Sequence, residues 1–128
     1  MNYLIDSNIF IYAIHPQDEK SYRFLSQLQS FAYASISKIE VLGYPELKQK
    51  EKELLESLFA MGQKIALTDS IEVKAIQLRQ QRRIKLGDAT IAATALVENL
   101  VLVTRNVEDF KKIKGLRLLN PYEKIKIL

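Results

Sequence analysis

The sequence predicts an α/β fold built on a parallel sheet. Short apolar runs alternate with segments whose apolar residues recur at helical spacing, an order typical of strand–helix–strand units. One run, residues 100–104, is continuously apolar up to a closing threonine, as expected for a parallel strand buried on both faces. The chain has 128 residues, which favours a single domain over 1–128. The crossovers between its strands should be right-handed.

Five strands are predicted, and all of them are short. The first runs directly into a carboxylate, and the last ends before Asn120-Pro121. The order of the strands in the sheet does not follow from these residues. The predicted strands are residues 3–5, 33–36, 64–67, 100–104 and 116–119.

Helices are predicted in the intervals between the strands. Ser37 with Glu40 three residues on matches a capping box, so a helix is expected to start at Ser37 and to end before Pro45. Asp69 is expected to cap a later helix, and Asn99 to end another in the left-handed conformation. The predicted helices are residues 7–14, 17–31, 37–44, 47–61, 69–82 and 89–96, with a short helical turn at 107–110.

Composition excludes several classes of protein. Apolar residues make up 48% of the chain, which supports a folded core. The absence of cysteine excludes disulfides and thiolate metal sites and suits a reducing compartment. No run approaches the roughly 20 apolar residues of a membrane span, and the start lacks the basic and apolar regions of a signal peptide. We therefore expect a cytoplasmic protein that does not enter a membrane.

The first strand ends at Asp6, and an apolar helical stretch follows at once. In open α/β sheets, ligands bind in the crevice beyond the carboxyl ends of the strands. Asp6 would stand at that edge, which makes it a candidate catalytic or metal-binding residue. The alternative is that Asp6 is an N-cap that accepts a hydrogen bond from a free backbone N–H of the next helix.

Three further acids share this setting. Glu40 lies on the helix after the second strand, Asp88 precedes a helix of small residues, and Asp109 follows the strand that ends at Thr104. Because the carboxyl ends of parallel strands meet at one edge, Asp6 and the turn that contains Asp109 should lie together. Asp88 reaches this edge only if its helix packs beneath it. For Glu40, the alternative is a role in the capping box.

Carboxylates that converge repel one another, and this repulsion raises their pKa values. A divalent cation relieves the repulsion, and magnesium takes carboxylate, water and phosphate oxygens as ligands. Such a site supports phosphoryl transfer. No Ser, Cys or His nucleophile needs to be invoked, since cysteine is absent and the only histidine, His15, precedes a proline at a helix end. The acids therefore predict a metal-dependent site that acts on phosphate esters.

The chain carries a formal net charge of +4, and several basic residues lie close in sequence to these acids. Arg82 and Arg83 precede Gly87-Asp88, and Arg105 follows directly after Thr104. Acids among basic residues suit a site that cuts a polyanion, because the cations bind its phosphates. We predict phosphate contacts for these three arginines. The alternative is that each is only a solvated residue on the surface.

Four segments together resemble a PIN domain. They are Leu-Ile-Asp-Ser-Asn around Asp6, Ser-Lys-Ile-Glu-Val-Leu-Gly around Glu40, Leu-Gly-Asp-Ala-Thr-Ile-Ala-Ala-Thr-Ala around Asp88, and Val-Thr-Arg-Asn-Val-Glu-Asp-Phe around Asp109. Within that family the chain is most similar to the VapC-type toxins of prokaryotic toxin–antitoxin pairs, and the resemblance covers essentially the whole chain.

The resemblance implies a three-layer α/β/α fold with five parallel strands in the order 3-2-1-4-5. It also implies an endoribonuclease that depends on magnesium or manganese and cleaves single-stranded RNA. A homodimer and inhibition by a cognate antitoxin protein are implied as well.

The resemblance also assigns roles to individual residues. Asp6, Glu40 and Asp88 match the three most regular acids of the family, which are catalytic and bind metal. Many relatives have aspartate where this chain has Asn106, and others use the acid that stands here as Asp109. The fourth position therefore stays open between these two residues. Two further residues are expected to lie just behind the ligands and to orient them: Asn8 and Thr104.

Two other interpretations of these residues remain. A phosphatase of the haloacid-dehalogenase type needs Asp-x-Asp after the first strand, whereas this chain has Asp6-Ser7-Asn8. A non-catalytic PIN-like module that binds RNA or protein is the second alternative, and it rests on the neutral Asn106. A nucleotide-binding Rossmann domain is excluded, because no Gly-x-Gly-x-x-Gly follows the first strand.

Overall fold

The computed structural model, which describes residues 2–123, contains a five-stranded sheet in the order β3-β2-β1-β4-β5. All neighbouring strands in it are parallel. The expected fold class and strand order are therefore confirmed, and each strand end lies within two residues of its predicted position. The strands are β1 Tyr3–Ile5, β2 Ala32–Ala34, β3 Gln63–Ile65, β4 Val101–Val103 and β5 Leu118–Leu119.

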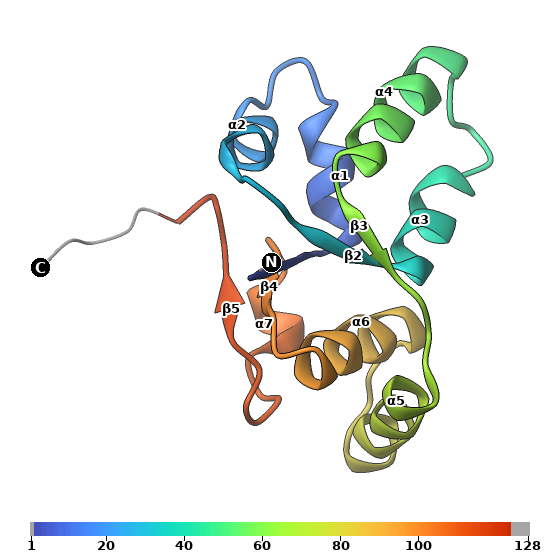
Figure 1. Ribbon diagram of the computed structural model, residues 1–128, viewed down its shortest axis with the longest axis vertical. Coiled ribbons are helices and arrows are strands. Elements are labelled where there is room, and N and C mark those ends of the chain that lie inside the picture. The colour runs from blue at the N-terminus through green and yellow to red at the C-terminus, as the bar shows by residue number, and fades with distance from the viewer. Residues whose placement is uncertain (1, 124–128) are drawn as a thin grey trace, which may run out of the picture.

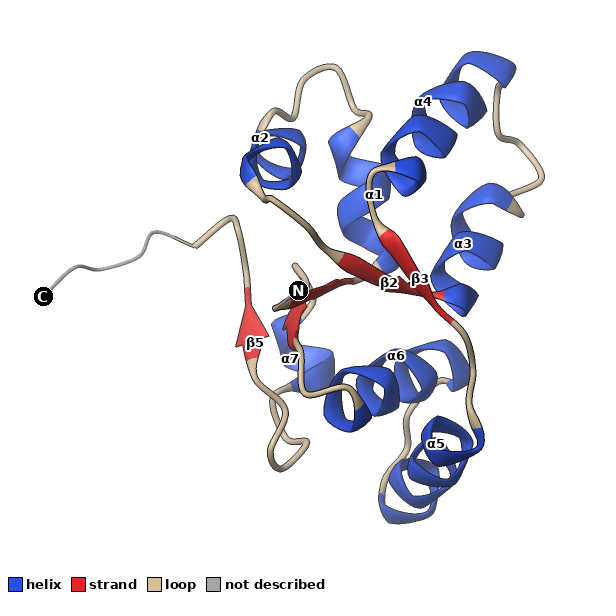
Figure 2. Ribbon diagram, viewed as in Figure 1, coloured by secondary structure: helices blue, strands red, loops and turns tan. Residues whose placement is uncertain are grey.

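Helices form the two outer layers. They are α1 Ser7–Ala13, α2 Lys20–Gln27, α3 Ser35–Leu42, α4 Gln49–Ala60, α5 Asp69–Gln81, α6 Leu86–Val97 and α7 Val107–Phe110. In Figure 1, α1 to α4 lie on one side of the sheet and α5 to α7 on the other. Figure 2 shows the strands as the layer between them.

Alternate residues of a strand enter different cores. Leu4 and Leu102 pack with residues of α5 and α6, whereas Ile5 and Val103 pack with residues of α1 and α4. This alternation follows from the two-residue period of a strand. It also explains why residues 100–104 are apolar without a break, since both faces of β4 are covered.

The helix predicted to start at Ser37 starts at Ser35 instead, directly after β2. Its N-cap is Ala34, which offers no side-chain hydrogen bond. Ser37 is fully buried near the start of α3, and its Oγ has no hydrogen-bond partner among residues 2–123. The capping box predicted for Ser37 and Glu40 is therefore wrong, because the chain passes from strand to helix without an intervening turn.

The helix predicted over residues 17–31 is shorter at both ends. The Asp18 carboxylate accepts a hydrogen bond from the backbone N–H of Lys20 just before α2. Leu28 already has an extended backbone, and the Phe31 carbonyl accepts from the Gln63 N–H, as in a strand pair. Phe31 is buried in the core just before β2. Its position in the sequence continues the helical spacing of apolar residues, which is why the predicted helix ran too far.

Other helix boundaries differ by a few residues. Thr68, not Asp69, caps α5, because its Oγ1 accepts from the Ile71 N–H over 3.3 Å. Gly87-Asp88, predicted as a corner, lies inside the first turn of α6. The left-handed conformation predicted for Asn99 is confirmed, with φ at 56°. No helix within residues 2–123 is long and apolar enough to cross a membrane.

Candidate active site

β1 and β4 lie side by side at the point where the strand order reverses. Ile5 stands opposite Val103, and the Asp6 N–H donates to the Val103 carbonyl over 2.9 Å. Asp6 and Thr104 are therefore neighbours just beyond the two strand ends. Ligands bind at this position in open α/β sheets, so this edge is the candidate active site.

Asp6 is buried, with 4% of its surface exposed. Its Oδ1 accepts a hydrogen bond of 2.8 Å from the Ser7 N–H, and its Oδ2 accepts one of 2.7 Å from the Thr104 hydroxyl. Thr104 Oγ1 in turn accepts from the Asn106 N–H over 2.9 Å. Asp6 is thus the N-cap of α1, as the alternative held, but the cap occupies only one carboxylate oxygen. The second oxygen is fixed by a bond that capping does not require.

Glu40 reaches the same edge from α3. Its Oε1 accepts a hydrogen bond of 2.8 Å from the hydroxyl of Ser7, the residue next to Asp6. The first turn of α6 lies against the other oxygen, because a Cβ added at Gly87 would stand 2.6 Å from Glu40 Oε2. Glycine at this position therefore leaves the space that the Glu40 carboxylate occupies.

The charges of the acids act on one another. Burial raises the pKa of Asp6 from 3.8 to about 6, and the hydrogen bonds from Thr104 and Ser7 offset only part of this rise. Repulsion from Asp88 and Glu40 adds to the increase. A cation bound beside Asp6 would lower this pKa again, because it would stabilise the ionised carboxylate.

Asp88 lies half-buried in the first turn of α6. Burial raises its pKa, and repulsion from Asp109 and Glu40 raises it further. The nearby ammonium of Lys85, the N-cap residue of α6, opposes this effect. Asp109 stands on α7 with an exposed side chain. The structure therefore places all four predicted acids within electrostatic reach of at least one other.

The four acids do not form a closed cage. Within the described part of the chain, no three Asp, Glu or His side chains lie close enough to hold one ion directly. The donor set nevertheless suits magnesium or manganese, because it consists of oxygens. Magnesium is usually held by one or two carboxylates, with waters and substrate phosphate as its remaining ligands. Asp6 and Asp88 fit this pattern.

Asn106 and Asn8 occupy different positions at the site. Asn106 is exposed, and its side chain makes no capping bond to α7, although its backbone N–H is bound to Thr104. Asn8 stands in the first turn of α1, and its Oδ1 is buried without a hydrogen-bond partner among residues 2–123. A buried acceptor of this kind is normally satisfied, and a bound water or ligand would satisfy it here.

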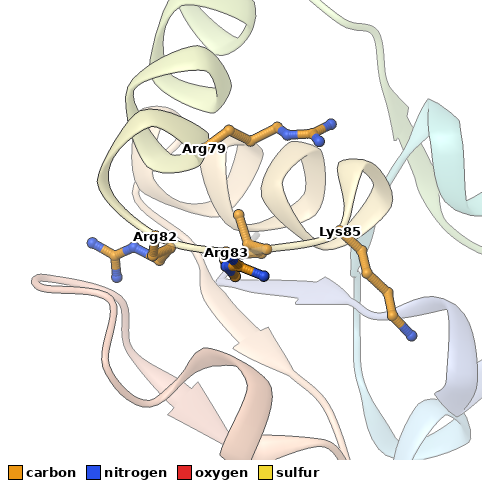
Figure 3. Close-up of a pocket in the computed structure, with 5 residues that line it drawn as sticks. Arg79, Arg82, Arg83 and Lys85 are labelled. Carbon is orange, nitrogen blue, oxygen red and sulfur yellow. The ribbon is translucent and has the colours of Figure 1, made fainter.

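Basic residues line an open pocket of about 540 Å³ between the end of α5 and the start of α6 (Figure 3). Two of the N–H groups of Arg82 already have partners within the protein, because the guanidinium donates to the Lys112 carbonyl and to Gln81 Oε1, each over 3.2 Å. The Arg83 side chain is exposed. In Figure 3 the side chains point in different directions, so they suit an extended polyanion better than one small anion. The pocket is lined by Arg79, Arg82, Arg83, Ile84 and Lys85.

Two residues at the site were missed from the sequence. Ser7 links Asp6 to Glu40 through its N–H and its hydroxyl, and Gly87 makes room for Glu40. The sequence holds a weak signal for each, since both stand directly beside a predicted acid. The partner of each, however, lies on another helix, and spacing along the chain does not reveal that contact.

Comparison with known proteins gives a consistent picture. The chain matches the family model described as PIN domain over residues 3–116. It is 33% identical over 133 residues to Ribonuclease VapC2 of Rickettsia felis, covering 94% of this chain and 98% of that protein. The solved structure of VapBC2 from Rickettsia felis, bound to a DNA fragment from its promoter, contains a similar chain. That match has a TM-score of 0.83 and 27% identity over 94% of this chain and 98% of that chain. A toxin–antitoxin complex from Klebsiella pneumoniae also contains one, with a TM-score of 0.79 and 29% identity over 96% and 100% of the two chains.

Proposed function

This chain belongs to the PIN domain family, and on that premise we propose that it is a metal-dependent endoribonuclease, the toxin of a toxin–antitoxin pair. It hydrolyses phosphodiester bonds of single-stranded RNA. The observation that carries this proposal is the buried Asp6 at the switch point of the sheet, with Asp88 and Glu40 close enough to raise its pKa. The name of the Rickettsia felis relative supports the same activity.

In this proposal Asp6 and Asp88 bind magnesium or manganese directly. The carboxylates of Glu40 and Asp109 lie at the edge of the metal site and add negative charge. When bound, the metal supplies positive charge for the phosphate oxygens and lowers the pKa of a bound water. Thr104 and Ser7 keep Asp6 fixed through the two hydrogen bonds to its carboxylate. Asn106 is neutral, so Asp109 is the better source of a fourth negative charge.

RNA is held by the basic pocket. Arg83 and Lys85 are exposed there, and Lys85 is close enough to Asp88 to lower its pKa. Lys85 therefore links the pocket to Asp88, as a polyanion that reaches both would require. Phosphate contacts of this kind give affinity without sequence preference.

A cognate antitoxin is proposed as the protein partner, because the matched solved structures include toxin–antitoxin complexes. The homodimer expected from the family resemblance stays a prediction. Light scattering of the purified chain, alone and with the co-expressed antitoxin, measures both assemblies.

A non-catalytic module that binds RNA or protein is the second candidate, and Asn106 is the feature that favours it. This candidate predicts no cleavage and no stabilisation by magnesium or manganese. The ribonuclease predicts both.

Cleavage of a mixed single-stranded RNA pool, with magnesium, with manganese and with EDTA, separates the two candidates. The expected result is cleavage with at least one metal and none with EDTA. Melting temperatures of the same samples report metal binding independently of the RNA sequence. The absence of both cleavage and a metal-dependent melting shift would favour the non-catalytic module.

A further inference from the structure

Arg105 lies one residue beyond Thr104, at the same sheet edge as Asp6, but outside the basic pocket. Its guanidinium carbon stands 4.8 Å from the ring centre of Tyr12 and 4.4 Å from that of Tyr122. The two rings are 6.0 Å apart with an angle of 71° between their planes. The guanidinium thus lies in the angle between two aromatic rings, each within the range of a cation–π contact.

One of these rings is held firmly in place. The Tyr122 hydroxyl donates to Asp18 Oδ2 over 2.7 Å and lies 2.6 Å from Ser21 Oγ. The Tyr122 N–H also donates to the side chain of Asn120 over 2.9 Å. These contacts join the segment after β5 to the start of α2. They hold the Tyr122 ring in a fixed position against Arg105.

The donors of Arg105 are left open. Among residues 2–123, no carboxylate forms an ion pair with Arg105, and its guanidinium donates no hydrogen bond. The cation–π contacts with the two rings use none of the N–H donors of Arg105, and the planar fork of these donors matches the geometry of a phosphate. A fixed guanidinium also loses less side-chain entropy when it binds.

We propose that Tyr12 and Tyr122 hold Arg105 as a preorganised phosphate-binding site for the RNA strand that enters the acidic centre. Tyr122 acts as a positioning residue, because it touches the arginine and not the RNA. This inference rests on the proposed ribonuclease function. It assigns a separate role to Arg105, whose site lies on the α1–α2 side of the acids, away from Arg83 and Lys85.

The test measures binding of a mixed-sequence single-stranded RNA of about 20 nucleotides to Asp88→Asn protein, in which cleavage is blocked, across a range of salt concentrations. Arg105→Gln should weaken binding about tenfold, the loss expected for one charge-assisted contact. It should also reduce the magnitude of the slope of log binding constant against log salt concentration by about 0.7, the value for one phosphate on a single strand. Arg105→Lys should restore the slope but not the full affinity, because lysine keeps the charge without the planar fork of N–H donors. Lys64→Gln is the matched control, since Lys64 is an exposed cation on β3 at the far edge of the sheet.

The positioning role is tested by a double-mutant cycle. Tyr122→Leu should weaken RNA binding in the Asp88→Asn background but cause no further loss when Arg105→Gln is already present. Tyr122→Phe keeps the ring and should bind RNA more tightly than Tyr122→Leu. A second double-mutant cycle pairs Tyr12→Leu with Arg105→Gln and tests the other ring in the same way. Melting temperatures show whether each variant is folded.

The outcomes separate this inference from the proposed function. An Arg105→Gln protein that binds RNA like Lys64→Gln, while the parent still cuts RNA, contradicts the inference alone. Equal losses from Tyr122→Leu with and without Arg105 contradict the positioning role of the tyrosine. Asp88→Asn protein that binds no RNA, together with a parent that cuts none, contradicts both the inference and the proposed function.

Discussion

The Thr104 hydroxyl donates a 2.7 Å hydrogen bond to Asp6 Oδ2, although the two residues are 98 positions apart in the chain. Both atoms are buried, and the same hydroxyl accepts a bond from the Asn106 N–H. The side chain of Thr104 therefore connects the turn after β4 to the acid after β1. Together with the Ser7 N–H, which donates to Oδ1, it fixes the orientation of the Asp6 carboxylate.

Replacing Thr104 with valine should impair the site while nearly preserving the shape of the core. A lost contact behind a metal ligand typically costs about 10- to 100-fold in metal affinity or activity. Thr104→Ser keeps the hydroxyl and is the matched control. Cleavage rates and manganese titrations of both variants test this, and a valine variant equal to the serine variant in both would contradict the role of the bond.

The pKa of Asp6 predicts a dependence of stability on pH in the metal-free protein. Because the folded carboxyl keeps its proton up to about pH 6 and the unfolded one loses it near 3.8, stability should fall as the pH rises through this window. The full change is about 3 kcal/mol from this residue. Above pH 6 the contribution levels off.

Urea unfolding of the parent and of Asp6→Asn from pH 4 to 7 isolates that contribution, since asparagine does not titrate. The stability of the parent relative to the variant should decline with rising pH. Saturating magnesium should reduce the decline, because the metal stabilises the ionised carboxylate. A stability difference that does not change with pH would show that the Asp6 pKa is unperturbed.

Gly87→Ala should separate activity from stability. The added Cβ would lie 2.6 Å from Glu40 Oε2, so the carboxylate must move, which a flexible side chain does at small cost. Alanine also favours a helix over glycine by up to about 1 kcal/mol. The melting temperature should therefore stay the same or rise, while RNA cleavage falls.

The Glu40→Ala variant controls for this mechanism. If Gly87→Ala acts by displacing Glu40, it should cause no further loss of cleavage in a Glu40→Ala protein. Independent losses that multiply in the double variant would mean that Gly87 matters for another reason.

Arg82 and Arg83 should respond differently to substitution. Arg83→Gln should weaken RNA binding and lower its salt dependence without affecting the melting temperature, because Arg83 is exposed. Arg82→Gln should also lower the melting temperature, since its half-buried side chain donates to the Lys112 carbonyl. Matching melting temperatures for the two variants, or an unchanged salt slope for Arg83→Gln, would contradict this division.

Much of this fold could be predicted from the sequence, because a buried parallel sheet leaves clear local signals. Residues 100–104 are apolar because β4 is covered on both faces, and Asn99 marks the end of a helix. The strand order came from the family resemblance, since pairing between distant strands leaves no local pattern. Two helix assignments were wrong because a local pattern fitted two structures. Phe31 continues the helical spacing of apolar residues although it lies just before β2, and Ser37 with Glu40 matches a capping box although Ser37 lies inside α3.

The site shows the same division between local and distant contacts. The position of Asp6 after an apolar strand pointed to the sheet edge. By contrast, the contact of Gly87 with Glu40 and the packing of Arg105 between Tyr12 and Tyr122 join elements far apart in the chain. Such contacts form only when the layers assemble.

We propose that the acids at the carboxyl edge of the sheet form a metal-dependent ribonuclease centre. The most direct test measures cleavage of single-stranded RNA by the parent, Asp6→Asn and Asp69→Asn, each with manganese and with EDTA. Asp69→Asn is the control, because Asp69 is an exposed acid in the first turn of α5. We predict manganese-dependent cleavage by the parent and by Asp69→Asn, and none by a folded Asp6→Asn protein. Cleavage by Asp6→Asn at the rate of the parent would contradict the claim.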